Sequence, residues 1–229
     1  MRSRSLRLRR SLVIGCLTIV ATGGALLMHS YAQKPAASPS AHTPSVILDV
    51  PFAPQSPFAV WDPLHEEACE EMSLIMVHHF LQKTPLSLDD AEKEVQAMVA
   101  WHRANGYGDD VSSAELGEIA EALYGYKTRV LTNVTADTLR KELIAGHPII
   151  IPVAGRYLKN PYFNGEGPFY HMLVVTGYTD DGFITNEPGT KRGEDYWYST
   201  EVLMNALHDW TGVKEEIATG AKTALVVER

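Results

Sequence analysis

The chain has 229 residues, of which 45% are hydrophobic and 21% charged, a balance that suits one globular domain with a buried core. It excludes collagen-like, coiled-coil and wholly disordered chains, and two cysteines are too few for a disulfide scaffold. Five arginines lie in the first ten positions, and the rest of the chain holds 15 basic and 28 acidic residues, a net charge of −13. Such a charge repels phosphate backbones and argues against a nucleic-acid partner.

The first 44 residues have the layout of a secretory signal followed by a spacer. Arginines precede an apolar stretch over residues 12–28 and small residues up to Ala32, which predicts a signal peptide over residues 1–32. An uncleaved membrane anchor is the alternative, although an apolar stretch of about 17 residues is short for a span. Residues 33–44 are rich in proline, alanine and serine and predict a flexible spacer. The folded domain is therefore expected over residues 45–229.

Apolar periodicity and capping residues place most helices first and most strands later. Helices are predicted over residues 66–82, 87–105, 113–123, 135–145 and 200–210. Strands are predicted over residues 46–48, 128–131, 149–153, 170–178, 183–187, 196–199 and 223–227. The expected N-caps include Ser87 and either Ser112 or Ser113. This order predicts an α+β fold with a segregated antiparallel sheet rather than alternating βαβ units.

Cys69 is the single cysteine left once the predicted signal is removed, and it lies in the first turn of a predicted helix. Unpaired N–H groups and the helix dipole stabilise a thiolate there, which favours a reactive thiol. The glutamates around it predict that this turn reaches the surface, and they also oppose thiolate formation unless a cationic histidine outweighs them. These glutamates are Glu66, Glu67, Glu70 and Glu71. A buried structural cysteine is the alternative.

His171 is the histidine best placed for general-base chemistry. It stands at the start of the apolar strand 170–178, directly after a loop rich in glycine and aromatic residues. From position alone, a histidine with a structural role is equally expected. The other histidines share no metal-ligand spacing, and neither HExxH nor CxxC is present, so we expect no metal and no cofactor.

The connector over residues 154–170 is too long and too aromatic for a plain link between strands. We expect Tyr162, Phe163 and Tyr170 to bind substrate, as parts of a loop that covers the site beside His171. The alternative is an ordered loop packed by its own aromatic side chains.

Four segments carry a family resemblance when they are taken in order. They are Val50-Pro51-Phe52 followed by Gln55, Ala68-Cys69-Glu70-Glu71-Met72-Ser73-Leu74, Tyr170-His171-Met172-Leu173-Val174-Val175 and Asn186-Glu187-Pro188-Gly189. Together they resemble the C39-like branch of the papain-type cysteine peptidases, the bacteriocin-processing double-glycine peptidases and their relatives. The resemblance implies a papain-like fold, in which an N-terminal helical part carrying the cysteine helix packs on an antiparallel sheet carrying the histidine.

The resemblance also implies a role for each matching residue. Cys69 would be the nucleophile, His171 the base and Gln55 the side-chain donor to the oxyanion, with the backbone N–H of Cys69 as the second donor. A third group holds the imidazole in such enzymes. The family's Asp-Pro is replaced here by Glu187-Pro188, which leaves Glu187 and Asn186 as candidates.

The turn at residues 180–182 decides between these two candidates, because neighbouring strand residues point to opposite faces of a sheet. A two-residue loop puts Asn186 on the face of His171. A three-residue loop, with Gly182 in a left-handed conformation, puts Glu187 there instead. We expect the longer loop, since the family's acid before proline aligns with Glu187 and a carboxylate stabilises an imidazolium better than an amide does.

The sequence therefore predicts an exported thiol peptidase or amidase, secreted or anchored to the outer face of the cytoplasmic membrane. It would act through a Cys69 acyl-enzyme, with His171 as the base, on a peptide or cell-wall-associated substrate. The alternative is a non-catalytic module that binds peptide or wall polymer on the same fold. Acyl transfer to an amine by the same thiol stays open, and an uncleaved apolar segment would tether the protein to the membrane.

Overall fold

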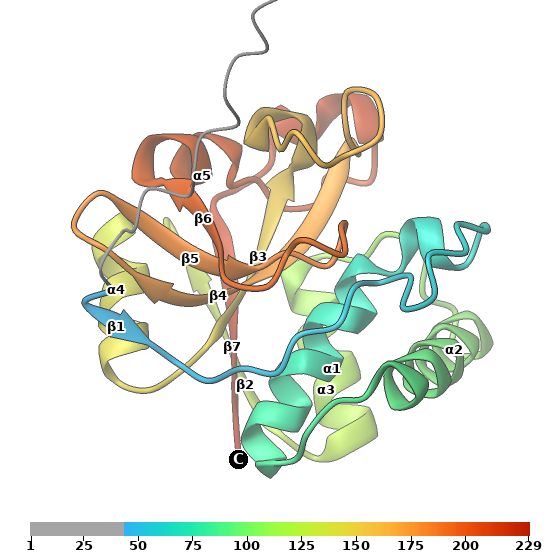
Figure 1. Cartoon of the computed structure of the whole chain (residues 1–229). Coiled ribbons are helices and arrows are strands. Elements are labelled where there is room, and N and C mark those ends of the chain that lie inside the picture. The colour runs from blue at the N-terminus through green and yellow to red at the C-terminus, as the bar shows by residue number, and fades with distance from the viewer. Residues whose placement is uncertain (1–43) are drawn as a thin grey trace, which may run out of the picture. The chain divides into compact units, whose positions relative to one another are not determined.

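The computed structural model describes residues 44–229, so the predicted signal peptide and nearly all of the spacer lie outside the described residues (Figure 1). The helices are α1 Cys69–Gln82, α2 Leu88–Ala104, α3 Ser113–Tyr124, α4 Ala136–Ile144 and α5 Thr200–Ala206, with short 3-10 turns η1 His65–Glu67, η2 Gly155–Leu158 and η3 Lys214–Thr219. The strands are β1 Val46–Ile47, β2 Lys127–Thr132, β3 Ile149–Ala154, β4 Tyr170–Tyr178, β5 Gly182–Asn186, β6 Tyr196–Ser199 and β7 Thr223–Glu228. In the described part of the chain, no helix is long and apolar enough to cross a membrane.

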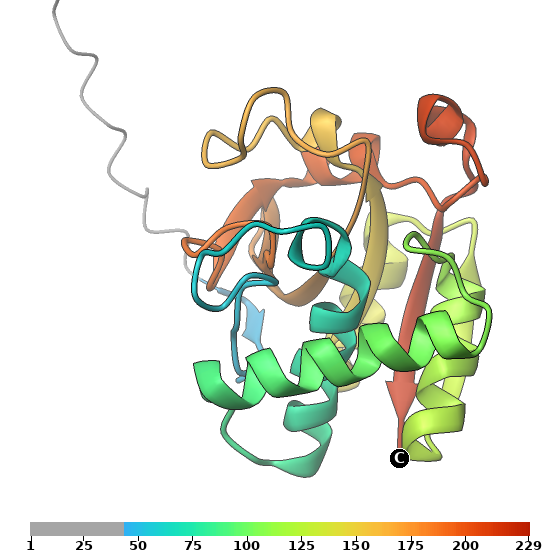
Figure 2. The same cartoon turned by 90° about the vertical axis from the view of Figure 1, so that its right-hand side faces the viewer.

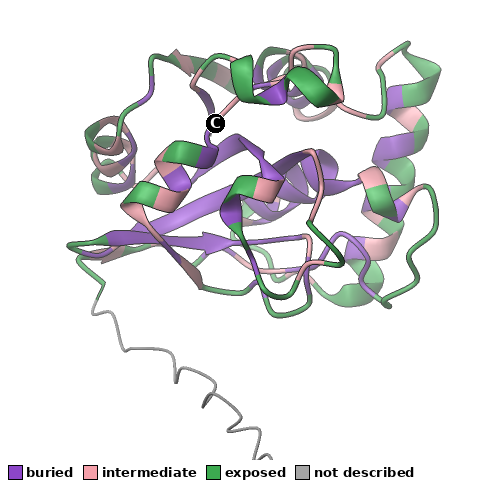
Figure 3. Cartoon of the chain, turned by 90° about the horizontal axis from the view of Figure 1, so that it is seen from above, coloured by how far each residue is buried: buried purple, intermediate pink, exposed green. Residues whose placement is uncertain are grey.

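All strands join one antiparallel sheet in the order β2-β7-β3-β4-β5-β6, and β1 pairs with the far end of β4. β4 is the long central strand, which pairs with β3 along residues 170–175 and with β1 at Gly177 and Tyr178. Every residue of β3 is buried, as are the first eight residues of β4, in agreement with their predicted apolar runs (Figure 3). A sheet buried on both faces requires helices on both sides.

Alternate residues of β3 and β4 point into two separate cores. Ile150, Met172 and Val174 pack with apolar side chains of α1, α2 and α3. Ile151 and Leu173 pack with those of α4 and α5. In Figure 1 the first three helices accordingly lie on one side of the sheet and the last two on the other. The expected α+β fold, with helices carrying the cysteine packed on a sheet carrying the histidine, is confirmed.

The helices begin at the predicted caps, with one informative exception. Side chains of Ser87, Ser112 and Thr135 accept backbone N–H groups at the starts of α2, α3 and α4. The helix predicted over residues 66–82 is divided, because η1 comes first and α1 begins only at Cys69. α1 is apolar on most sides rather than along one stripe, because it lies between β4 and α2 (Figure 2).

The last predicted helix, over residues 200–210, is shorter than expected. α5 ends at Ala206, where Leu207 becomes extended and forms a bridge with Val153 of β3. The chain therefore returns to β3, beyond the residues at which β7 pairs with that strand, instead of continuing as a helix.

The hairpin between β4 and β5 differs from both predicted turns. Tyr178 pairs with Phe183, so the connection spans residues 179–182, and Gly182 does not adopt a positive φ. The glycine is required for close packing instead, because a Cβ at this position would collide with Trp197. The turn is closed by Thr179, whose backbone N–H donates to the carbonyl of Gly182 at 2.9 Å.

A β-bulge at Thr176 then changes the register of this hairpin. Gly177 pairs with Ile184, but Val175 pairs with Thr185 and Val174 with Asn186, so Thr176 has no partner residue on β5. Beyond the bulge, Glu187 comes level with Leu173 and so lies on the face that Leu173 shares with His171. The predicted three-residue loop is wrong. The face predicted for Glu187 is nevertheless correct, because the extra residue at the bulge shifts the pairing by one and puts Glu187 on the same face as His171.

Candidate active site

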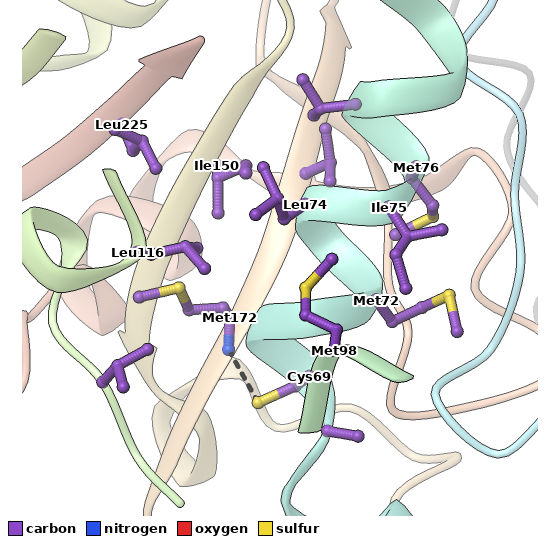
Figure 4. Packing of buried hydrophobic residues seen from close by; sticks show 14 of the residues in the cluster. Cys69, Met72, Leu74, Ile75, Met76, Met98, Leu116, Ile150, Met172 and Leu225 are labelled. Carbon is purple, nitrogen blue, oxygen red and sulfur yellow. Dashed lines mark hydrogen bonds between the residues drawn. The ribbon is translucent and has the colours of Figure 1, made fainter. Parts of the chain in front are cut away.

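Cys69 is the first residue of α1 and is only 5% exposed, so the expectation of a partly exposed thiol is wrong. Its Sγ donates to Oε2 of Glu70 at 3.0 Å and accepts the backbone N–H of Met172 at 3.4 Å (Figure 4). Burial raises the pKa of the Cys69 thiol well above its usual value, and the adjacent Glu70 raises it further. The thiol is therefore held in its neutral form in this arrangement.

The four glutamates around Cys69 divide into two pairs at the break between η1 and α1. Glu66 is exposed and Glu67 forms an ion pair with Lys214 at 3.1 Å, so this pair lies near solvent as expected. Glu70 and Glu71 are 1% and 2% exposed, which contradicts the prediction that they reach the surface. They are buried because α2 and the loop before α3 cover this turn, where Glu71 Oε1 lies 2.8 Å from His102 Nδ1 and Glu70 Oε1 accepts the N–H of Val111 at 3.3 Å.

His171 is bonded to Glu187, which settles the geometric choice between the two candidate partners. Nε2 of the imidazole donates to Oε1 of Glu187, a carboxylate with no exposed surface. Asn186 points elsewhere, because its Nδ2 donates to the carbonyl of Val50 at 2.9 Å. With Nε2 carrying the proton, Nδ1 is the ring nitrogen with a lone pair, as a general base requires.

Glu187 is in turn held by groups that were not among the predicted site residues. Its Oε1 accepts the N–H of Gly189 at 2.9 Å, and its Oε2 accepts the hydroxyl of Tyr198 at 3.0 Å. The Tyr198 oxygen itself accepts Nδ2 of Asn160 at 2.7 Å. Burial, and then the charge of Glu187, raises the pKa of Tyr198 well above its usual value, so this hydroxyl remains a donor. The aromatic pattern of β6 was the available signal for Tyr198, and Asn160 had none.

One cavity of about 210 Å³ brings the predicted residues together. Its lining includes Gln55, Cys69, Phe163, Tyr170 and His171. The Phe163 ring meets the imidazole edge to face, with centroids 5.5 Å apart, and Tyr170 is anchored below by its hydroxyl, which donates to the carbonyl of Val111 at 2.8 Å. The cavity therefore brings together the predicted nucleophile, the predicted base and two of the three expected substrate-binding residues.

Tyr162, the third expected substrate-binding residue, lines an adjoining cavity of about 260 Å³. Trp61, which the sequence reasoning missed, lines both cavities and is 41% exposed. The loop over residues 154–170 thus presents aromatic side chains to both cavities. It is also packed internally, since the Arg156 guanidinium stacks on the Phe169 ring at 3.5 Å, and the binding of substrate by its aromatic side chains stays a prediction.

Gln55 lies beside Cys69 but its amide is engaged with the backbone. Nε2 donates to the carbonyls of His65 at 2.8 Å and Glu66 at 3.2 Å, while the buried Oε1 has no hydrogen-bond partner. His65 is itself fixed, with Nδ1 at 2.8 Å from Asp62 and Nε2 at 3.2 Å from Glu92. Gln55, the expected oxyanion donor, therefore lies at the same cavity as Cys69, but its amide protons are directed at backbone carbonyls of η1.

Within the described residues, no group of three histidine, cysteine, aspartate or glutamate side chains is arranged to hold a metal ion. Side chains that line the cavity supply a thiol, an imidazole, two carboxyl groups and an amide.

Comparisons with known proteins place this arrangement in a family. The model of the Peptidase_C39 like family matches residues 47–217. A solved structure described as a C39-like peptidase from Bacillus anthracis is similar with a TM-score of 0.52 and 18% identity, over 80% of this chain and 97% of that chain. At that identity the likeness concerns the fold, and it agrees with the papain-like arrangement of α1 and the sheet.

A second solved structure is more distant. It is a double glycine motif protease from an AMS/PCAT transporter in complex with a leader peptide, with a TM-score of 0.46, 19% identity, and coverage of 80% of this chain and 94% of that chain. No curated protein matches this chain.

Proposed function

The chain belongs to the Peptidase_C39 like family, and on that premise we propose that it is a cysteine peptidase or amidase with Cys69 as its nucleophile. The observation that carries the proposal is one cavity lined by a helix-terminal cysteine and by a histidine bonded to a fully buried carboxylate. Nucleophile, base and orienting group are the three roles that acyl transfer by a thiol requires.

In the proposed reaction, His171 takes the Cys69 proton on Nδ1 and the thiolate attacks the substrate carbonyl carbon. Glu187 stabilises the imidazolium that forms and holds the ring through Nε2. The oxyanion is stabilised by the backbone N–H of Cys69, because the first N–H groups of a helix lack intrahelical partners. Gln55 adds a second donor once its amide turns away from η1. The imidazolium then protonates the leaving amine, and water, deprotonated by His171, releases the acyl group.

The proposed substrate is a peptide, or a peptide attached to the cell wall, that lies along the two adjoining cavities. Aromatic rings of Trp61, Tyr162 and Phe163 line these cavities, and Glu66 and Glu67 line the one at Cys69. These acids and the −13 balance of the body favour a neutral or basic residue near the cleaved bond. We place this activity outside the cytoplasm because of the predicted export signal.

A non-catalytic binding module remains a second candidate, and two observations favour it. The Cys69 thiol donates to Glu70, and the Gln55 amide is directed at backbone carbonyls, so neither group is poised for catalysis in this arrangement. The cavity alone suits peptide binding in either case.

The deciding experiment combines covalent labelling with turnover. A peptidyl epoxide should add once to the wild-type protein by intact mass, not at all to Cys69→Ala, and far more slowly to His171→Ala. The wild type should also cleave members of a pool of neutral and basic peptides. Cleavage that survives in Cys69→Ala would overturn the proposal, and peptide binding without any cleavage would establish the binding module instead.

A further inference from the structure

Glu70 accepts the S–H of the proposed nucleophile, and the reaction above gives it no part. It is 1% exposed, and its Oε2 lies 3.0 Å from Cys69 Sγ as the acceptor of the S–H. Its Oε1 accepts the N–H of Val111 at 3.3 Å, which fixes the carboxyl group to the loop before α3. A side chain anchored at one oxygen and bonded to the thiol at the other has a defined orientation toward the sulfur.

Two donor–acceptor contacts define the surroundings of the sulfur. Sγ donates to Glu70 and accepts the N–H of Met172 at 3.4 Å. The thiol proton is therefore directed at Glu70 rather than at the imidazole of His171. To reach the imidazole of His171, the S–H must first turn away from Glu70.

We propose that Glu70 is a positioning residue that keeps the Cys69 thiol protonated in the free enzyme by accepting its S–H. The inference rests on the proposed function, since it assigns Glu70 a role in the resting state of that nucleophile. The proton stays on sulfur while the S–H faces Glu70, and it passes to Nδ1 of His171 only after the S–H has turned. No oxidant, reductant or further reactant takes part in this step.

The acids that face Glu70 raise its pKa, whereas its contact with the Cys69 thiol lowers it. Cys69 and Glu71 lie beside it on α1, Asp110 faces it from the loop before α3, and Tyr170 faces it from β4. Burial, and then the charge of Glu71, raises the pKa of Glu70 well above its usual value. When it is ionised, Glu70 opposes thiolate formation by its charge as well as by accepting the S–H.

The test is the pH profile of Cys69 alkylation by iodoacetamide, a small neutral reagent that reacts with the thiolate. Glu70→Gln keeps the shape and the acceptor for Val111, but presents an N–H to the sulfur, which favours the thiolate. We expect the rate constant at pH 7 to rise about tenfold, equivalent to about 1.4 kcal/mol. Glu71→Gln is the matched control, because it removes the adjacent buried acid without touching the sulfur.

Each outcome bears on the proposal. A profile of Glu70→Gln that superimposes on the wild type would overturn it, as would an equal acceleration in Glu71→Gln, which would assign the effect to charge instead of contact. Should Glu70→Gln fail to fold, the wild type alone suffices for refutation, because alkylation already at its plateau near pH 6 would show a free thiolate. The assay needs no peptide turnover. If the alkylation profile of Glu70→Gln shifts but the wild type cleaves no peptide, the proposed function is overturned while the role of Glu70 is supported.

Discussion

Replacing Glu187 by glutamine should lower turnover while leaving substrate binding unchanged. The carboxylate has no exposed surface and does not line the cavity, so it acts on the reaction only through His171. In Glu187→Gln the amide oxygen can still accept from His171 and Gly189, but the imidazolium loses its negatively charged partner. The NH₂ group would also face the Tyr198 oxygen, which already accepts from Asn160.

The size of the effect follows from the bond that changes. A hydrogen bond to a charged group contributes about 1.5–3 kcal/mol, and a neutral one about 0.5–1.5 kcal/mol. The difference between corresponding ends of these ranges, roughly 1.0–1.5 kcal/mol, corresponds to a decrease in kcat of about 5- to 13-fold. Glu187→Ala should cost more, because it leaves His171, Tyr198 and the Gly189 N–H without their buried acceptor, and it should also lower the melting temperature.

The assay is steady-state cleavage of a peptide substrate, with thermal unfolding measured by circular dichroism. For Glu187→Gln we expect a lower kcat, a KM close to that of the wild type and a small change in melting temperature. Tyr198→Phe is the matched control, since it removes one donor to Glu187 and keeps the charge, so its loss should be smaller. A kcat of Glu187→Gln within twofold of the wild type, or a change confined to KM, would refute the assignment of Glu187 as the orienting group.

Three further outcomes are expected. Gln55→Ala should slow acylation by roughly 10²-fold in single-turnover kinetics if the amide turns to the oxyanion, and an unchanged rate would leave Gln55 as a structural clamp on η1. Burial raises the pKa of Glu70 above its usual 4.5, so the contribution of neutral Glu70 to folding stability is full below pH 4.5 and is lost as the pH rises. The melting temperatures of Glu70→Gln and the wild type should therefore diverge above pH 4.5, and a difference that stays constant with pH would contradict this. N-terminal sequencing of exported protein should start at or near Gln33, whereas an intact, membrane-bound start would indicate an anchor.

Local signals predicted the elements well, and long-range packing accounts for most of what they missed. Ser87, Ser112 and Thr135 act as caps because their hydroxyls satisfy backbone groups within the same turn. The burial of Glu70 depends on a loop about 40 residues later in the chain, which supplies the N–H of Val111. Nothing within a helical window distinguishes that glutamate from the exposed Glu66.

Sequence patterns also predicted only part of the candidate site. The order of the motifs predicted that Cys69, His171 and Gln55 lie together, and the structure places all three at one cavity. Trp61 and Asn160 escaped notice because each stands in an irregular segment, where side-chain direction follows from tertiary contacts rather than from a period. The wrong turn at residues 179–182 had a similar cause, since a threonine side chain and the bulk of Trp197 determine it.

The bulge at Thr176 has a consequence for how relatives of this protein are compared. It lies on the β5 side of β4 alone, because on the other side the carbonyl of Thr176 accepts the N–H of Leu48 and continues the regular pairing with β1. If Thr176 instead paired with Thr185, Val175 would pair with Asn186, and Asn186 would lie on the face of His171 in place of the acid. The spacing of 16 residues between His171 and Glu187 therefore depends on the bulge, and alignments of such chains should be anchored on strand parity rather than on residue spacing.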